Sequence, residues 1–210
     1  MSRCSHVLLF ASLITVMSAL TLANPASAQP APAGPQLDGR LYAPNSVNLS
    51  PLGVAFGSYS VNFERLVTPH HGLIVEGQFS SSSNDANTST SGGVALGWRL
   101  HFNGTQRSWF VGVMGAYNVG SAEATITDSA GTRAIDLSTT ALSLTANFGK
   151  RWVFGPGINI TFRFGLGWAK YNVTTDSTDP SAKEAVEAVD ALLAFIPIGI
   201  DGELSIGFCF

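Results

Sequence analysis

From about Val54 to the C-terminus, apolar residues alternate with small or polar ones. The clearest example runs from Val94 to Phe102, where Val, Leu, Trp, Leu and Phe alternate with Ala, Gly, Arg and His. Successive side chains of a β-strand point to opposite faces, so this period of two predicts a strand with one apolar and one polar face. Similar segments begin near Tyr59, Leu73, Trp109, Leu142, Ile158 and Leu204. The pattern therefore predicts an all-β chain.

Alternation alone does not tell which face is inside, because a soluble sandwich or a lipocalin-like barrel also alternates, with its apolar face inward. Here the polar face is rich in glycine, alanine and serine, and the apolar face keeps large, uncharged residues along each whole strand. The connections also alternate between short and long, as in transmembrane barrels. The short ones are Leu66–Gly72, Asn103–Arg107 and Lys150–Pro156, and the long ones are Ser80–Gly92, Gly120–Leu137 and Asn172–Pro197. We therefore predict a transmembrane β-barrel with its apolar face outside.

Seven strands are clear in the pattern, whereas bacterial barrels of this class have an even number. An additional strand at Leu41–Leu49 gives an eight-stranded antiparallel barrel. The last long connection contains one predicted short helix, which begins near Pro180 with Ser181 and Glu184 as a capping box. Its apolar stripe consists of Val186, Val189, Leu192, Leu193 and Ile196. We expect this helix either on the barrel rim at the membrane interface or inside the lumen as a plug.

Charged residues make up only 12% of the chain, whereas hydrophobic residues make up 45%. Soluble proteins have about 25% charged residues, which cover their outside. A surface that faces lipid needs few. Charge is also sorted between the connections, since the short ones are basic and the long ones acidic. The acids of the long connections are Asp85, Glu123, Asp128, Asp136, Asp176, Asp179, Glu184, Glu187 and Asp190. We therefore expect the short turns in the periplasm and the acidic connections outside the cell.

The N-terminus has the features of a secretory signal peptide. Arg3 precedes an apolar stretch from Val7 to Leu22, and Ala26 and Ala28 form the small-x-small motif that signal peptidase reads. Serine and threonine interrupt this stretch, so a retained membrane helix is the less favoured alternative. The predicted divisions of the chain are a signal peptide at 1–28, a disordered Pro/Ala-rich linker at 29–40 and a barrel domain at 41–210.

The chain ends in Leu204–Phe210, where Leu, Ile, Phe and Phe alternate with Ser, Gly and Cys. This segment resembles the C-terminal assembly signal of outer-membrane barrels, a terminal aromatic residue that follows residues of alternating hydrophobicity. The resemblance implies recognition by the barrel-assembly machinery through Phe210, with support from Phe208 and Ile206.

The mature chain as a whole is similar to the OmpA/OmpX-like small barrels. Within it, the run Gly57–Arg65 followed by a short turn with His70 and His71 resembles an uncharacterised family of outer-membrane barrel domains, to which no reaction is assigned. These resemblances imply a location in the bacterial outer membrane, with lipid and lipopolysaccharide as partners. We expect a monomer with no nucleic-acid partner.

Five charged residues share the parity of the polar, inward face: Glu64, Glu76, Arg99, Arg163 and Glu203. The lumen of an eight-stranded barrel is only wide enough for its own side chains, and buried charge is costly unless it is paired. We therefore predict a polar network in the lumen that fixes the register of the strands. A proton- or ion-conducting path is the alternative.

No catalytic, cofactor or metal site is predicted. His70 and His71 are adjacent, so on a strand they point to opposite faces, and His101 has no Cys, Asp or second His at ligand spacing. Barrel enzymes need a His-Ser or Asp-His arrangement at the membrane edge or the outer rim, whereas these histidines lie on the predicted periplasmic side. The leading hypothesis is a structural or surface-interaction protein that needs no cofactor. The alternative is transport of a small solute or apolar molecule through the barrel or its wall.

Overall fold

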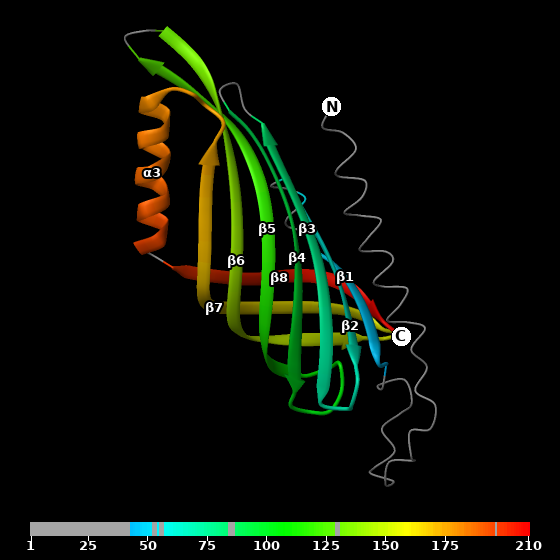
Figure 1. The fold of residues 1–210 in the computed structure, drawn as a ribbon. Helices are drawn as coiled ribbons and strands as arrows, with labels where there is room; N and C mark the ends of the chain where they lie inside the picture. The colour runs from blue at the N-terminus through cyan, green and yellow to red at the C-terminus, as the bar shows by residue number, and fades with distance from the viewer. Residues whose placement is uncertain (1–42, 52–53, 55–56, 84–86, 129–130, 196) are drawn as a thin grey trace. The chain divides into compact units, whose positions relative to one another are not determined.

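The computed structural model describes residues 43–51, 54, 57–83, 87–128, 131–195 and 197–210. In these residues, eight strands form one closed barrel in which each strand is antiparallel to its neighbours (Figure 1). They are β1 (Asn45–Leu49), β2 (Ser58–Leu66), β3 (His71–Ser83), β4 (Asn87–His101), β5 (Trp109–Asp128), β6 (Gly131–Phe154), β7 (Ile158–Thr175) and β8 (Ile198–Cys209). The predicted eight-stranded antiparallel barrel is confirmed. The predicted signal peptide, with Ala26 and Ala28, and the linker at 29–40 lie outside the described residues.

The first strand, which the pattern supports least, exists but is short. It is predicted at 41–49 and observed at Asn45–Leu49. It pairs with β2 on one side and β8 on the other, so it closes the barrel. The closure extends to the last residue, because the backbones of Asn45 and Phe210 exchange hydrogen bonds at 3.0 and 2.9 Å. The inward side chains of this strand, Ser46 and Asn48, are fully buried.

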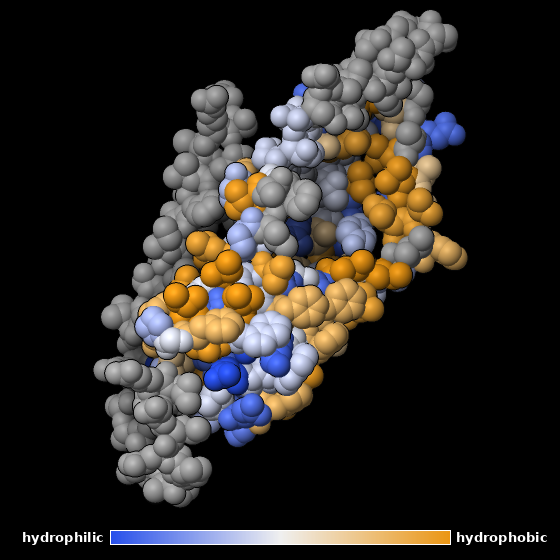
Figure 2. All heavy atoms as spheres, turned by 180° about the vertical axis from the view of Figure 1, so that it is seen from behind, coloured by the Kyte–Doolittle hydropathy of each residue, from blue (hydrophilic) through white to orange (hydrophobic). Residues whose placement is uncertain are grey.

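The two faces of the strands point as the alternation predicts. Most large apolar side chains of one parity face outward, and they remain about half exposed: Leu96 is 64% exposed, Leu144 59% and Ile206 50%. Figure 2 shows such apolar side chains gathered in a broad band across one face of the molecule. Phe63 and Val75 are exceptions, since they have the outward parity and are buried. An apolar band of this extent on a folded chain marks a surface that is not in water, so the barrel is of the transmembrane type.

The prediction of three long connections is wrong for two of them. β3 continues to Ser83 and β4 starts at Asn87, while β5 continues to Asp128 and β6 starts at Gly131. These polar, Ser/Thr-rich stretches are predicted as loops because the apolar alternation stops there. A strand in water does not need an apolar face, however, since pairing with its neighbour satisfies its backbone and threonine favours extended structure. The acidic residues Glu123, Asp128 and Asp136 therefore lie on strands.

The third connection contains the predicted helix, α3, at Pro180–Phe195. It begins just after Asp179, whose carbonyl accepts a hydrogen bond from the Lys183 amide at 3.2 Å. Ile196, predicted as part of its stripe, lies outside the described residues. None of the helices that the structure describes is long and apolar enough to span a membrane.

The helix lies at the rim, along an edge of β7 that β8 leaves uncovered. The pairing of β7 with β8 ends where Trp168 lies opposite Ile198, and the next bond joins the Ala169 amide to the Pro197 carbonyl at 3.1 Å. Further along the same edge, the Val173 amide donates to Asp190 Oδ1 of the helix at 3.0 Å. Covering an exposed strand edge with a helix satisfies its backbone and protects it from other chains. Figure 1 shows α3 beside the upper part of β7.

Candidate functional site: the charged network of the lumen

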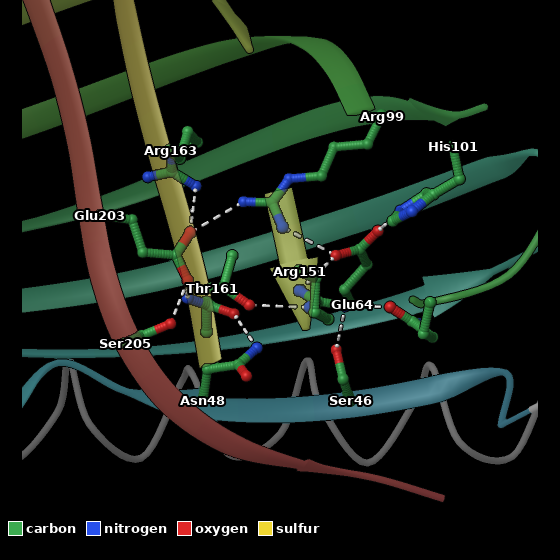
Figure 3. Close-up of polar contacts among 12 residues, drawn as sticks. Ser46, Asn48, Glu64, Arg99, His101, Arg151, Thr161, Arg163, Glu203 and Ser205 are labelled. Carbon is green, nitrogen blue, oxygen red and sulfur yellow. Dashed lines mark hydrogen bonds and ion pairs between the residues drawn. The ribbon is translucent and has the colours of Figure 1, made fainter. Parts of the chain in front are cut away.

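The five charged residues predicted to point into the lumen come from five strands. Glu64 is on β2, Glu76 on β3, Arg99 on β4, Arg163 on β7 and Glu203 on β8. The structure places all five on the inward face, where none is more than 9% exposed. They lie close enough to form ion pairs with one another. Figure 3 shows four of them, Glu64, Arg99, Arg163 and Glu203.

Glu64 is the centre of one half of the network, and its side chain is fully buried. Its Oε2 atom accepts hydrogen bonds from Arg99 Nη1 at 2.8 Å and from Arg151 Nη2 at 2.9 Å. Its other oxygen, Oε1, lies 2.6 Å from His101 Nε2. This carboxylate therefore joins β2 to β4 and, across the lumen, to β6.

Arg163 is the centre of the other half. Its Nη2 atom donates to Glu76 Oε2 at 2.9 Å and to Asp201 Oδ1 at 2.8 Å. Its Nη1 atom lies 3.0 Å from Glu203 Oε2, which also accepts a hydrogen bond from Arg99 Nη2 at 2.9 Å. Glu203 thus connects the two halves into one chain of alternating charges.

Neutral side chains complete the hydrogen bonding of the charged groups. Glu203 Oε1 accepts from Asn62 Nδ2 at 2.8 Å and from the Ser205 hydroxyl at 2.5 Å. Arg151 donates through Nε to Thr161 Oγ1 at 2.8 Å and through Nη1 to Ser46 Oγ at 2.9 Å, and it also bonds Gln106. Charge-assisted hydrogen bonds of this kind offset the cost of taking charge out of water.

Glycines and one aromatic ring make room for the long charged side chains. The guanidinium carbon of Arg99 lies 4.4 Å from the centre of the Phe110 ring, which is 1% exposed. A Cβ added at Gly149 would lie 2.5 Å from Cζ of that ring and 2.3 Å from the Phe162 carbonyl oxygen. A Cβ at Gly72 would lie 2.4 Å from Glu64 Oε1. A side chain at Gly149 or Gly72 would therefore collide with Phe110 or with Glu64 of the network.

The apolar alternation does not predict Arg151 and Asp201 as members of the network. Arg151 falls within the predicted turn at Lys150–Pro156, but β6 continues to Phe154 and brings Arg151 to the same face as Asn147. Asp201 has the parity of Glu203 but precedes the part of β8 where alternation is clear. In both cases the parity could have been extended along the strand. The strand ends could not be read from the pattern, because it fades there.

A carboxylate, a histidine and a serine meet at the end of the lumen near the short turns. Besides its contact with Glu64, His101 places Nδ1 3.0 Å from Ser108 Oγ. The serine hydroxyl donates to the Trp109 carbonyl at 2.8 Å, and the serine is only 3% exposed. Glu64 already accepts from two guanidinium groups. The arrangement therefore holds His101 in place and does not present a nucleophile to a substrate.

The side chains of His70 and His71 make contacts in different places. His70 Nδ1 lies 2.7 Å from the His101 carbonyl oxygen, whereas the His71 ring stacks on Trp98 at 5.4 Å. Across the described ranges of the chain, no group of three or more His, Cys, Asp or Glu residues could hold a metal ion. Cys209 is a free, buried cysteine, and its sulfur lies 3.4 Å from Asn159 Nδ2.

No protein-family model and no curated protein matches this chain. Among solved structures, the chain is similar to the crystal structure of CarO from Acinetobacter baumannii, with 13% identity, a TM-score of 0.47 and coverage of 81% of this chain and 99% of that chain. It is also similar to that of A. baumannii CarO2, with 10% identity, a TM-score of 0.45 and coverage of 79% and 97%. Similarity at this level carries nothing about function.

Proposed function

We propose that this chain is an outer-membrane barrel of the OmpA/OmpX-like type with a structural and surface-interaction role, whose lumen is closed by its own side chains. The observation that carries the proposal is the ion-pair network, which crosses the lumen between β2, β4, β6, β7 and β8. In the proposed orientation, the short turns face the periplasm. The extended ends of β3 to β7 and the helix α3 face the outside of the cell.

The outward surface supports a place in a membrane. Apolar side chains occupy it from Trp109 to Tyr117 on β5 and from Ile158 to Trp168 on β7. Near the short turns, Lys150 lies over the rings of Trp109 and Trp152, at 4.6 and 5.2 Å from the ring centres. Tryptophan and lysine are the residues expected where hydrocarbon meets headgroups. Lipid and lipopolysaccharide are therefore the proposed neighbours of this surface.

The closed lumen follows from the energetics of the network. Arg99, Arg151 and Glu64 are fully buried, and Arg163 is 2% exposed. A solute could pass only by separating buried ion pairs, and leaving a buried charge without its partner costs about 3–5 kcal/mol. The network thus holds the opposite walls of the barrel together and excludes solutes.

The part outside the membrane supports the surface role. Its strands are paired to their ends, so it forms a fixed surface and not a set of flexible loops. The exposed acidic residues on it include Glu123, Asp136, Asp176, Glu184 and Glu187. A fixed, acidic surface favours partners that carry positive charge or bound divalent cations.

The C-terminal strand supports assembly as an outer-membrane barrel. Ile206, Phe208 and Phe210 all face outward and are 50%, 44% and 53% exposed. Ile206 and Phe208 lie on β8, which closes the barrel with β1, and Phe210 follows β8 directly. We propose that the assembly machinery binds these three side chains before closure.

Conductance in planar bilayers tests the closed lumen. The purified protein should give no stepwise current, and Arg163→Ala, which leaves three carboxylates without their shared partner, should increase ion leakage. Glu123→Ala, outside the lumen, is the matched control and should stay silent. Folding of each variant is checked by the gel mobility of unboiled samples. Stable single-channel steps from the unaltered protein would contradict the proposal.

One observation favours the transport alternative. Several buried polar atoms of the lumen have no hydrogen-bond partner among the described residues: Arg99 Nε, Arg163 Nε, Asn48 Oδ1, Thr145 Oγ1 and Asn147 Oδ1. Water would satisfy them, and a connected row of waters would conduct protons or small ions. The same bilayer recordings distinguish transport from a closed lumen, since transport requires current from the unaltered protein.

A further inference from the structure

The C-terminal half of α3 carries an apolar surface that no other part of the described chain covers. Val189, Leu192 and Phe195 are 47%, 60% and 84% exposed. They are three residues apart, so they form one stripe along the helix. The exposed charged residues of the helix, Lys183, Glu184 and Glu187, all lie nearer its start. The helix is therefore charged at one end and apolar at the other.

Contacts with β7 determine how the helix is turned. Asp190 accepts the hydrogen bond from the Val173 amide, Ala182 is 2% exposed, and Val186 and Leu193 are half-buried. These four residues share one face. The stripe begins beside that face at Val189 and reaches the opposite side of the helix at Phe195, so packing against β7 leaves it uncovered.

The apolar end of the helix lies at the border of the lipid-facing band. Only residues 196 and 197 separate Phe195 from Ile198, which is 52% exposed and pairs with Trp168 at the upper end of the band. Three residues of chain span at most about 10 Å. Leu192 is about 4.5 Å further along the helix and Val189 about 9 Å, since each residue rises about 1.5 Å. The stripe thus continues the band formed by Ile198 and Ile200, of which Ile200 is 73% exposed.

We propose that the Val189, Leu192 and Phe195 stripe of α3 inserts into the outer leaflet, so that lipid acyl chains are the partner of this surface. The stripe is continuous with the band that faces lipid, and the charged end of the helix points the other way along its axis. Exposed apolar side chains of interfacial helices are buried by about 5–10 Å at the headgroup and acyl boundary, and the stripe lies where the lipid-facing band ends. The helix then anchors the outer part of the barrel to the membrane surface. This inference rests on the proposed membrane location.

Site-specific fluorescence quenching tests the insertion. Cys4 and Cys209 are replaced by serine, and single cysteines at Phe195, Leu192, Glu187 or Glu184 are labelled with bimane in the full-length protein. The protein is reconstituted in phosphatidylcholine vesicles that contain brominated acyl chains. We expect quenching by brominated lipid at 195 and 192 to exceed that at 187 and 184 by at least about twofold, with the opposite order for aqueous iodide.

A cysteine at Leu144, on the outward face of β6 and 59% exposed, tests the membrane location of the barrel separately from the insertion of the helix. If bimane at 144 is quenched by brominated lipid while 192 and 195 are quenched only by iodide, the helix is in water and the inference is wrong. Protection of 192 and 195 from both quenchers would mean that protein covers the stripe, which also overturns it. If bimane at position 144 is not quenched by brominated lipid, the proposed membrane location is wrong. The gel mobility of unboiled samples shows that each variant has folded.

Discussion

The inward faces of the strands differ between the level of the membrane and the level above it. Within the lipid-facing band, the lumen is filled by large charged side chains such as Glu64, Arg99 and Arg163, which are joined in one network. At the outer border of the band and above it, the same faces carry uncharged residues: Ala116, Asn118 and Ala141 are half-buried, and Gln78 is exposed. On β3 the exposure changes between two successive inward residues, since Glu76 is 9% exposed and Gln78 is exposed.

This difference follows from where water is. At the level of the band, the outside of the barrel faces lipid and its lumen is narrow. Charged side chains that are paired with one another fill this lumen. Above the band, water reaches both faces of the extended strands, and their backbone pairing is sufficient to keep them extended. Stability should therefore depend on the lumen network and much less on the outer part.

The largest effect is expected from Glu64→Ala. The substitution removes the carboxylate that pairs with Arg99, Arg151 and His101, and it leaves buried guanidinium groups undercompensated. We expect a loss of about 3–5 kcal/mol in the free energy of unfolding, measured by urea titration in lipid vesicles. Glu123→Ala, an exposed carboxylate above the band, is the control. Equal losses for both variants would remove the distinction between the two levels.

A smaller loss is expected from crowding the lumen. Gly149→Ala brings a Cβ to within 2.3 Å of the Phe162 carbonyl oxygen and 2.5 Å of Phe110 Cζ. Overpacking of this kind costs about 1–3 kcal/mol. Gly115→Ala is the matched control on the outward face, where the nearest atoms would be 3.9 and 4.0 Å away. The comparison fails if Gly115→Ala destabilises as much in the same titration.

Asp190→Ala tests the contact between the helix and the barrel edge. It removes the acceptor for the Val173 amide, and we expect a loss of about 1 kcal/mol, localised at the rim. Hydrogen exchange measured by mass spectrometry should increase for peptides of α3 and the end of β7, with no change at Arg99 on β4. An increase spread over the whole barrel would show that the helix stabilises more than the rim.

The smallest effect is expected from shortening the β5–β6 hairpin. Replacing residues 125–134 by an Asn-Gly turn leaves the pairs with β4 and β7 in place, since the last of them join Asn87 to Ala124 and Thr175 to Leu137. We expect the free energy of unfolding to change by less than about 0.5 kcal/mol. A large loss in the urea titration would mean that the outer strands support the band below them.

The sequence by itself determined the class of fold, the sidedness of the strands and the five charged residues of the lumen. Each depends on the period of two, which is local and holds wherever one face of a strand meets lipid. The helix at Pro180–Phe195 was predictable for the same reason, from its own apolar spacing.

Only the tertiary structure decided how far the strands continue, which partner each charge has, and where the helix lies. The sequence around Ser89 and Thr90 has no apolar period of two that would predict a strand. These residues nevertheless pair with Ala122 and Ser121, because β5 is beside them. Arg151 reaches Glu64 only because the closure of the barrel brings β6 opposite β2. Such contacts join residues far apart in the chain, and their geometry is determined by strand register and closure, which a local pattern does not contain.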